Sequence, residues 1–144
     1  MRPFDQFPQS FKSRIQFVLT DIDDTLTCQG RLPGCVLEAM ERLQESGIRV
    51  VPVTGRPAGW CDHIARMWPV DGVIGENGAF YFRYDRSLQK MVRRYWKTDT
   101  QRQTDRTRLE NLKKTILEQV PSARISADQA YREADLAIDF CEDV

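Results

Sequence analysis

The chain has 144 residues, of which 41% are hydrophobic and 29% are charged, and its 21 basic residues balance its 21 acidic residues. This composition is typical of a soluble globular domain. The lack of a net positive charge argues against nucleic acid as the main partner. The longest apolar runs are far shorter than the roughly 20 residues of a membrane span, so no membrane partner is expected. Residues 1–13 lack the apolar core of a signal peptide.

Four cysteines, at positions 28, 35, 61 and 141, form no Cys-x-x-Cys pair, and His63 is the single histidine. This pattern favours reduced thiols and a cytoplasmic location. Cys35 and Cys61 fall on expected helices, where we predict that they pack. A cysteine nucleophile is disfavoured, because His63 lies only two positions from Cys61 and therefore on a different helix face.

Strands and helices alternate in the first half of the chain. Short apolar runs predict strands over 15–20, 48–53 and 72–75. Apolar residues at helical spacing predict one helix that stops at Gly47 and another that opens at 54–57, with an apolar stripe of Trp60, Ile64, Met67 and Trp68. The order predicts an α/β fold with a Rossmann-like parallel sheet and right-handed crossovers.

The second half has a different character. Two strand-like runs over 79–84 and 90–96 predict a hairpin. Residues 98–108 are almost wholly polar and are expected to form a linker and the first turns of a helix that ends before Pro121, and the last strand is expected over 136–140. We therefore predict a core unit over 1–97 and a smaller α+β unit over 98–144.

Two carboxylates, Asp21 and Asp23, follow the first expected strand directly. Like charges about 5 Å apart repel by roughly 1 kcal/mol in water and by more inside a protein, so Mg²⁺ is the expected counter-ion. Asp21 is suited to attack phosphorus and form an aspartyl-phosphate, and Asp23 to move the proton. The plainer alternative is a polar turn that caps local N–H groups.

Thr54 follows the second strand, and parallel strands end at the same edge of a sheet, so Thr54 and Asp21 are expected to be neighbours. Gly55 lets the backbone approach an anion. Arg56 suits either a phosphate or a surface ion pair. For Thr54 the alternative role is a helix N-cap. The three residues predict a phosphate-binding loop.

The Asp21-Ile22-Asp23-Asp24-Thr25 run, followed by Thr54, resembles the first two motifs of the haloacid dehalogenase superfamily. Ile74-Gly75-Glu76-Asn77-Gly78-Ala79 is similar to a turn of its sugar-phosphate-phosphatase branch, which inserts a cap after the third core strand (type IIB). The resemblance implies a Mg²⁺-dependent hydrolase of a small phosphorylated metabolite. It implies that Asp21 and Asp23 also bind the metal, that Thr54 binds the phosphoryl group and that Asn77 lines the cleft. Asn77 equally suits a turn residue with positive φ.

The superfamily's third motif, a Lys or Arg, and its fourth, an acidic pair, have no match in the chain, which ends at Glu142-Asp143-Val144. The sequence therefore resembles an N-terminal portion with part of a cap. The alternative to an enzyme is an inactive remnant that binds phosphate or Mg²⁺ weakly. A receiver-like signalling domain is disfavoured, because the key Asp closes the first strand. An incomplete sheet leaves an unpaired strand edge, which favours self-association.

Overall fold

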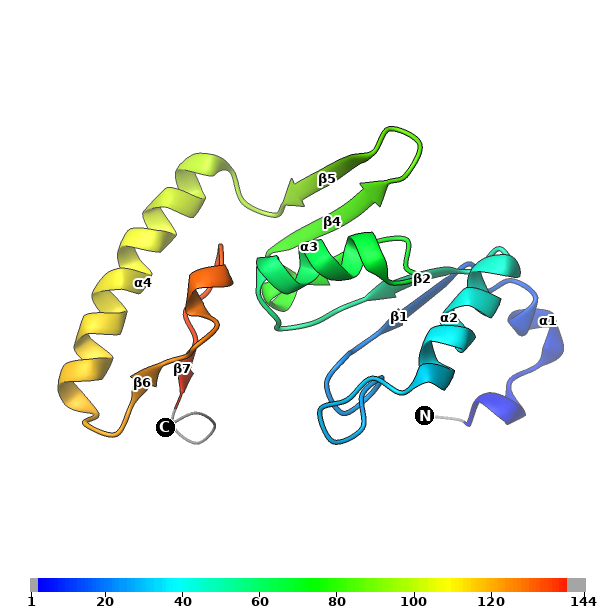
Figure 1. The fold of residues 1–144 in the computed structure, drawn as a ribbon, viewed down its shortest axis with the longest axis horizontal. Coiled ribbons are helices and arrows are strands. Elements are labelled where there is room, and N and C mark those ends of the chain that lie inside the picture. Colours follow the sequence, from blue (N-terminus) through cyan, green and yellow to red (C-terminus); the bar gives the residue numbers. More distant parts are fainter. Residues whose placement is uncertain (1–2, 140–144) are drawn as a thin grey trace.

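The structure, a computed structural model, describes residues 3–139 (Figure 1). Two short helices, η1 (Phe4–Gln6) and α1 (Gln9–Lys12), precede the alternating part of the chain. That part consists of β1 (Phe17–Thr20), α2 (Gly34–Glu45), β2 (Arg49–Pro52), α3 (Ala58–Met67) and β3 (Val73–Gly75). β1 pairs with β2 in parallel, and a parallel bridge between Val53 and Ile74 places β3 beside β2. The predicted α/β fold with a parallel sheet is confirmed.

An antiparallel hairpin extends the sheet beyond β3. A single turn, η2 (Glu76–Gly78), leads from β3 into β4 (Phe80–Asp85), and β4 pairs with β5 (Lys90–Tyr95). Asp85 stabilises the hairpin turn, because its carboxylate accepts hydrogen bonds from the backbone N–H groups of Ser87 and Leu88, both at 3.1 Å. The hairpin predicted over 79–96 is therefore confirmed.

The core lies between the sheet and α3, which crosses in front of β4 in Figure 1. Phe80 and Phe82 point to the same face of β4, are 2% and 0% exposed, and stack with 4.3 Å between ring centroids. They share one buried cluster with Cys61, Ile64 and Ala65 of α3. Burial of these side chains supplies the main stabilisation of the sheet against the helix.

The predicted apolar stripe of α3 is partly wrong. Ile64 is buried, but Trp60 is 47% and Met67 69% exposed, and small residues such as Cys61 occupy the face toward the sheet. The reason is the close approach of helix and strand. A Cβ atom added at Gly75 of β3 would lie 2.5 Å from Cys61 Sγ, so this interface leaves no room for an indole ring.

One face of β1 carries exposed apolar side chains: Phe17 is 45% and Leu19 62% exposed. Among residues 3–139, β1 pairs only with β2, so its outer edge is unpaired. An unpaired edge can pair with a strand of another molecule, which is the reason to expect self-association. Self-association stays a prediction.

The C-terminal part contains α4 (Asp99–Gln119), β6 (Arg124–Ile125), η3 (Gln129–Tyr131) and β7 (Ile138–Asp139). The linker expected within 98–108 is wrong, because α4 begins at Asp99, but the helical turns expected there and the end of the helix before Pro121 are confirmed. A capping box starts it: Thr98 N donates to Gln101 Oε1 at 2.9 Å, and Gln101 N donates to Thr98 Oγ1 at 3.3 Å. Only part of the predicted last strand is seen, and its end at Phe140 lies outside the described residues. None of the helices described is long and apolar enough to cross a bilayer.

Candidate functional site

The loop after β1 is a tight turn around one carbonyl oxygen. The carbonyl of Ile22 accepts hydrogen bonds from the backbone N–H groups of Thr25, Leu26 and Thr27, at 3.3, 2.9 and 3.0 Å. The Ile22 side chain is 3% exposed and anchors the turn in the core. Asp21, directly before it, is exposed, and Asp23, directly after it, is partly exposed. The turn thus presents both carboxylates to solvent around one buried anchor.

Backbone hydrogen bonds join the loop after β2 to the end of β3 and the turn that follows it. Thr54 N donates to the carbonyl of Ile74 at 2.9 Å, and Asn77 N donates to the carbonyl of Thr54 at 3.2 Å. Thr54 is 2% exposed, and its Oγ1 accepts a hydrogen bond from Arg56 N at 3.0 Å. The alternative role of Thr54 as helix N-cap is wrong, because Pro57 occupies that position. Its hydroxyl hydrogen remains available for donation to a ligand.

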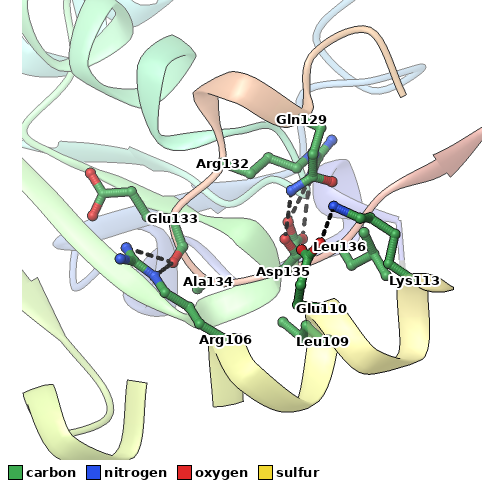
Figure 2. A pocket seen from close by; sticks show the side chains of 10 residues that line it. All are labelled: Arg106, Leu109, Glu110, Lys113, Gln129, Arg132, Glu133, Ala134, Asp135 and Leu136. Carbon is green, nitrogen blue, oxygen red and sulfur yellow. Dashed lines mark hydrogen bonds and ion pairs between the residues drawn. The ribbon is translucent and has the colours of Figure 1, made fainter. Parts of the chain in front are cut away.

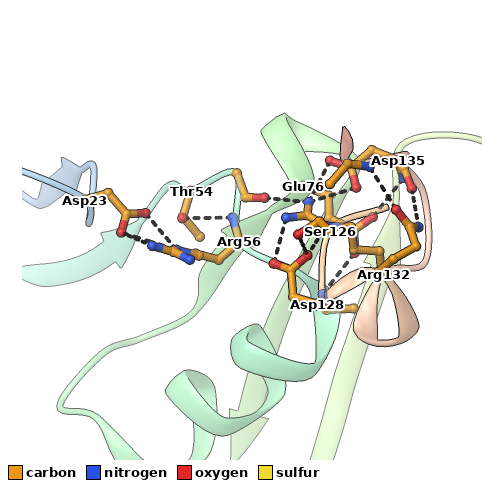
Figure 3. Close-up of polar contacts among 12 residues, drawn as sticks. Asp23, Thr54, Arg56, Glu76, Ser126, Asp128, Arg132 and Asp135 are labelled. Carbon is orange, nitrogen blue, oxygen red and sulfur yellow. Dashed lines mark hydrogen bonds and ion pairs between the residues drawn. The ribbon is translucent and has the colours of Figure 1, made fainter. Parts of the chain in front are cut away.

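The two loops meet through an ion pair between Arg56 and Asp23 (Figure 3). Arg56 Nε lies 3.0 Å from Asp23 Oδ2, and Arg56 Nη2 lies 2.7 Å from Asp23 Oδ1, which is a two-pronged contact. The register supports this placement, because Val53 N donates to the carbonyl of Thr20 at 2.8 Å, one residue before Asp21. The expectation that the ends of β1 and β2 lie together is met.

Trp60 supports Arg56 from α3. The guanidinium carbon of Arg56 lies 4.7 Å from the centroid of the Trp60 ring, a cation–π contact. Of the two roles open to Arg56 from sequence, the structure shows the ion pair, and its partner is the second carboxylate of the loop. Trp60, expected in the core, instead lies exposed beside this pair.

Asn77 lies over the phosphate-binding loop predicted at 54–56. A Cβ atom added at Gly55 would lie 3.2 Å from the Asn77 Oδ1 atom, a tight contact, so the lack of a side chain at Gly55 favours this close approach of the amide. Asn77 has φ 57°, which agrees with the turn role as well as with a place beside the loop. Both features that sequence suggested for Asn77 are compatible in one geometry.

Sequence reasoning missed Glu76 and Arg132. Glu76 is 3% exposed, although it lies in a polar turn, and its carboxylate binds four backbone N–H groups. The Arg132 guanidinium is held between Asp128 and Asp135 and donates to the carbonyl of Gly55 at 3.0 Å (Figure 3). The charged run 132–135 before an apolar strand was the available signal, but it does not reveal these partners.

A magnesium ion fits the chemistry of the loop but finds few protein ligands there. Mg²⁺ prefers oxygen, and it is commonly held by one or two carboxylates with several waters. Asp21 and Asp23 supply such oxygens, and Asp23 has a backbone carbonyl besides its carboxylate. Within residues 3–139, no group of three or more His, Cys, Asp or Glu side chains is arranged to hold a metal ion.

A pocket of about 230 Å³ lies away from the carboxylate loop, between α4 and residues 129–136 (Figure 2). Three basic and three acidic side chains line it, and each has a polar partner: another lining side chain, nearby backbone or, for Glu133, the Tyr95 hydroxyl. Lys113 pairs with Glu110 at 2.5 Å, Arg132 pairs with Asp135, and Arg106 donates to the carbonyl of Glu133. Because its charged side chains already have partners, the pocket carries no argument for a charged ligand.

The three described cysteines differ in exposure. Cys61 is buried as predicted, but Cys35 is exposed, since it lies on the outer side of the first turn of α2, and Cys28 is exposed too. Burial, with the nearby charge of Glu76, raises the pKa of the Cys61 thiol to about 12. The thiolate is the reactive form, so Cys61 is unsuited to act as a nucleophile.

We therefore expect iodoacetamide at pH 8 to modify Cys28 and Cys35 in the folded chain and to leave Cys61 unmodified. Peptide mass mapping after a short reaction gives the result, with urea-unfolded chain as the control in which Cys61 also reacts. Rapid modification of Cys61 in the folded chain would contradict the burial and raised pKa described above.

Comparisons with known proteins show the family of the chain. Residues 18–133 match the sequence profile of the haloacid dehalogenase-like hydrolases. A phosphoglycolate phosphatase of Methanospirillum hungatei is 38% identical over 80 residues, which cover 54% of this chain and 34% of that protein. One of Methanoculleus marisnigri is 34% identical over 71 residues, which cover 48% of this chain and 30% of that protein. The chain thus spans about a third of the length of these curated relatives.

Solved structures show the same fold. A Thermoplasma acidophilum protein superposes with a TM-score of 0.62 at 20% identity, over 88% of this chain and 51% of its own. A Bacteroides thetaiotaomicron phosphatase of the haloalkanoate enzyme superfamily gives a TM-score of 0.50 at 24% identity, over 78% and 40%. With the sequence match over most of its length, the chain belongs to the family of haloacid dehalogenase-like hydrolases.

Proposed function

We propose that this chain carries the nucleophile loop of a Mg²⁺-dependent hydrolase of phosphate monoesters. The observation that carries the proposal is the Arg56–Asp23 ion pair, because it joins the loop after β1 to the loop after β2 while Asp21 stays exposed beside them. A nucleophile, a proton carrier and groups for binding an anion then share one edge of the sheet.

In the first step, a carboxylate oxygen of Asp21 attacks phosphorus and the bond to the leaving oxygen breaks. Asp23 gives that oxygen a proton, and Asp21 becomes an aspartyl-phosphate. In the second step, Asp23 takes a proton from water, whose oxygen attacks phosphorus and releases inorganic phosphate, and the Asp21 carboxylate is restored. Each step moves one proton through Asp23.

The remaining residues bind the phosphoryl group. The Thr54 hydroxyl and the backbone at Gly55 precede α3; the hydroxyl can donate to a phosphate oxygen, and glycine lets the backbone come close to it. The Arg56 guanidinium already holds one carboxylate, and phosphate oxygens offer it the same two-pronged geometry. Asn77 lies beside Gly55, which supports a role in lining the substrate cleft. A Mg²⁺ ion held by Asp21 and Asp23 supplies positive charge to the phosphate oxygens.

We further propose that residues 1–97 belong to the core and that 98–144 begin a cap. The start of α4 at its capping box and the separate β6–β7 sheet support this division. The substrate proposed is a small phosphorylated metabolite such as a sugar phosphate. Because both curated relatives are named phosphoglycolate phosphatases, phosphoglycolate is the first compound to test.

A second candidate is a unit that binds phosphate or Mg²⁺ without turnover. It is favoured by the small number of acidic ligands, since no group of three or more metal-ligating side chains occurs in the part of the chain described. Weak Mg²⁺ binding by calorimetry, combined with no turnover, would support this candidate over the first.

The test of the first candidate is release of p-nitrophenol from p-nitrophenyl phosphate by the purified chain. We expect release with Mg²⁺, loss of release with excess EDTA, and recovery when Mg²⁺ is added back, because two carboxylates without a cation repel both each other and the substrate. Turnover that persists in EDTA would contradict the role given to the metal. No turnover under any condition would overturn the hydrolase proposal for this chain.

A further inference from the structure

Glu76 is a buried carboxylate that the proposed reaction does not use. It lies in the turn after β3 with φ 44°, a left-handed conformation that non-glycine residues seldom adopt. Its Oε1 accepts hydrogen bonds from Ala58 N and Glu133 N, both at 2.9 Å. Its Oε2 accepts from Ala134 N at 2.5 Å and from Asp135 N at 3.0 Å. Both oxygens are thus fully used, which is the usual condition for a buried charge.

The donors of these hydrogen bonds come from two distant parts of the chain. Ala58 is the first residue of α3, whose free N–H groups and dipole attract a negative charge. Residues 133–135 offer three successive N–H groups to one point, a concave arrangement that binds anions. The Glu76 carboxylate therefore acts as an internal anion that binds the start of α3 to the segment 133–135.

Arg132 makes a second connection between the same two parts. Its side chain is 10% exposed, and Nη1 donates to the carbonyl of Gly55 at 3.0 Å. Asp128 and Asp135 hold the guanidinium in place, at 2.8 and 2.9 Å. The hydrogen bonds from Arg132 lower the pKa of Asp128 below its ordinary value. Figure 3 shows Arg132 and Glu76 side by side next to the loop of Thr54 and Arg56.

We propose that Glu76 and Arg132 are positioning residues for the phosphate-binding loop, and that together they clamp the segment 128–135 onto residues 54–58. Glu76 holds the end of this loop through Ala58, and Arg132 holds its middle through Gly55. Neither side chain touches the predicted reacting groups, so both act through the backbone geometry of the loop. The inference rests on the proposed function, because it presumes that the loop binds phosphate.

The clamp has a consequence for the role of the C-terminal part. Because the segment 128–135 is bound to the loop directly, a shift of this segment changes the orientation of the N–H groups and of the Thr54 hydroxyl that face the anion. In metal sites, the groups behind the ligands that orient them change affinity by about 10–100-fold when they are removed, and an effect near the lower end of that range is expected here. We therefore expect loss of the clamp to lower the affinity of the chain for phosphate.

The test measures binding of inorganic phosphate, in the presence of Mg²⁺, to the whole chain by calorimetry. We expect Glu76→Gln and Arg132→Lys each to weaken binding by about tenfold. Asp71→Asn is the matched control for Glu76, because its carboxylate also accepts a backbone N–H, from Val50 at 2.9 Å, but lies before β3. Arg124→Lys is the control for Arg132, since its guanidinium donates to the carbonyls of Pro121 and Ala123. Both controls are expected to bind phosphate as the unchanged chain does.

Chemical rescue separates positioning from loss of fold. Glu76→Ala leaves the four N–H donors around an empty space, and formate is a carboxylate small enough to enter it. We expect formate at about 0.1 M to restore the phosphate affinity of this variant, and chloride at equal ionic strength to have no such effect. Formate is expected to leave the phosphate affinity of the unchanged chain as it is. Should Glu76→Ala fail to fold, Glu76→Gln and hydrogen exchange at residues 54–58 replace it, with loss of protection expected there as well as at 133–135.

The outcomes are distinguishable. If the unchanged chain binds phosphate and the Glu76 and Arg132 variants bind it equally well, the clamp has no positioning role and the inference is overturned alone. The inference is also overturned alone if hydrogen exchange in these variants increases at 133–135 while residues 54–58 stay protected. If the unchanged chain binds no phosphate, the proposed function itself fails.

Discussion

Asp21→Asn is expected to abolish Mg²⁺-dependent hydrolysis of p-nitrophenyl phosphate, with a loss of at least about 10³-fold in kcat. An amide neither attacks phosphorus as a carboxylate does nor offers a negative charge to the metal. The fold should be unaffected, because the Asp21 side chain is exposed after the end of β1. The measurement is a steady-state assay at saturating Mg²⁺, with a thermal melt of both proteins to compare their stability.

Asp24→Asn is the matched control for this experiment. Asp24 lies in the same loop and is also exposed, and its φ of 56° is a value that asparagine tolerates. We expect Asp24→Asn to retain most of the activity. If Asp21→Asn remained as active as Asp24→Asn, then Asp21 would not be the nucleophile, and the alternative of a simple polar turn at 21–25 would gain support.

The parts of the fold that were predictable from sequence are those that local signals specify. Apolar runs that end in polar loops identified the positions of β1, β2 and β3, and parallel pairing then placed the ends of β1 and β2 together. Turn residues identified the hairpin of β4 and β5. The polar composition of 98–108 suggests a linker before the first helical turns, whereas the capping box, which is also a local signal, starts α4 at once.

The contacts of the site were less predictable, because they join residues far apart in sequence. Arg56 meets Asp23 across 33 positions, and Arg132 meets the carbonyl of Gly55 across 77. The sequence offered several acidic partners for each arginine and no means to choose among them. Glu76 illustrates the difficulty, because a glutamate in a polar turn is normally exposed, and only the tertiary arrangement of Ala58 and residues 133–135 makes its burial favourable.

The helix faces were mistaken for a different reason. Hydrophobic periodicity ranks side chains by polarity, so it assigned Trp60 to the buried stripe of α3. Between α3 and β3, however, the volume of a side chain decides whether it fits. Gly75 and Cys61 approach each other so closely that only small residues fit on that face of the helix. The large aromatic rings of the core come instead from β4, where Phe80 and Phe82 fill the space under the helix.

Phe82→Ala is accordingly expected to cost about 3–5 kcal/mol in the free energy of unfolding. Phe82 is 0% exposed, stacks on Phe80 at 4.3 Å and contacts the edge of Tyr95, with 6.1 Å between ring centroids. The substitution leaves a cavity that the neighbouring side chains fill only in part. Since small proteins have a total stability of about 5–15 kcal/mol, the variant is expected to lose a large share of it and to unfold at a much lower urea concentration.

Urea unfolding followed by circular dichroism provides the measurement, and Phe4→Ala is the control. Phe4 is 64% exposed in η1, so we expect its replacement to cost less than about 1 kcal/mol. The result also bears on the site, because Phe82 pairs with Val73 of β3, and β3 leads directly into Glu76 and Asn77. Equal losses for the two variants would show that the packing of β4 against α3 does not hold the sheet together, and the positions of Glu76 and Asn77 would then need another source of rigidity.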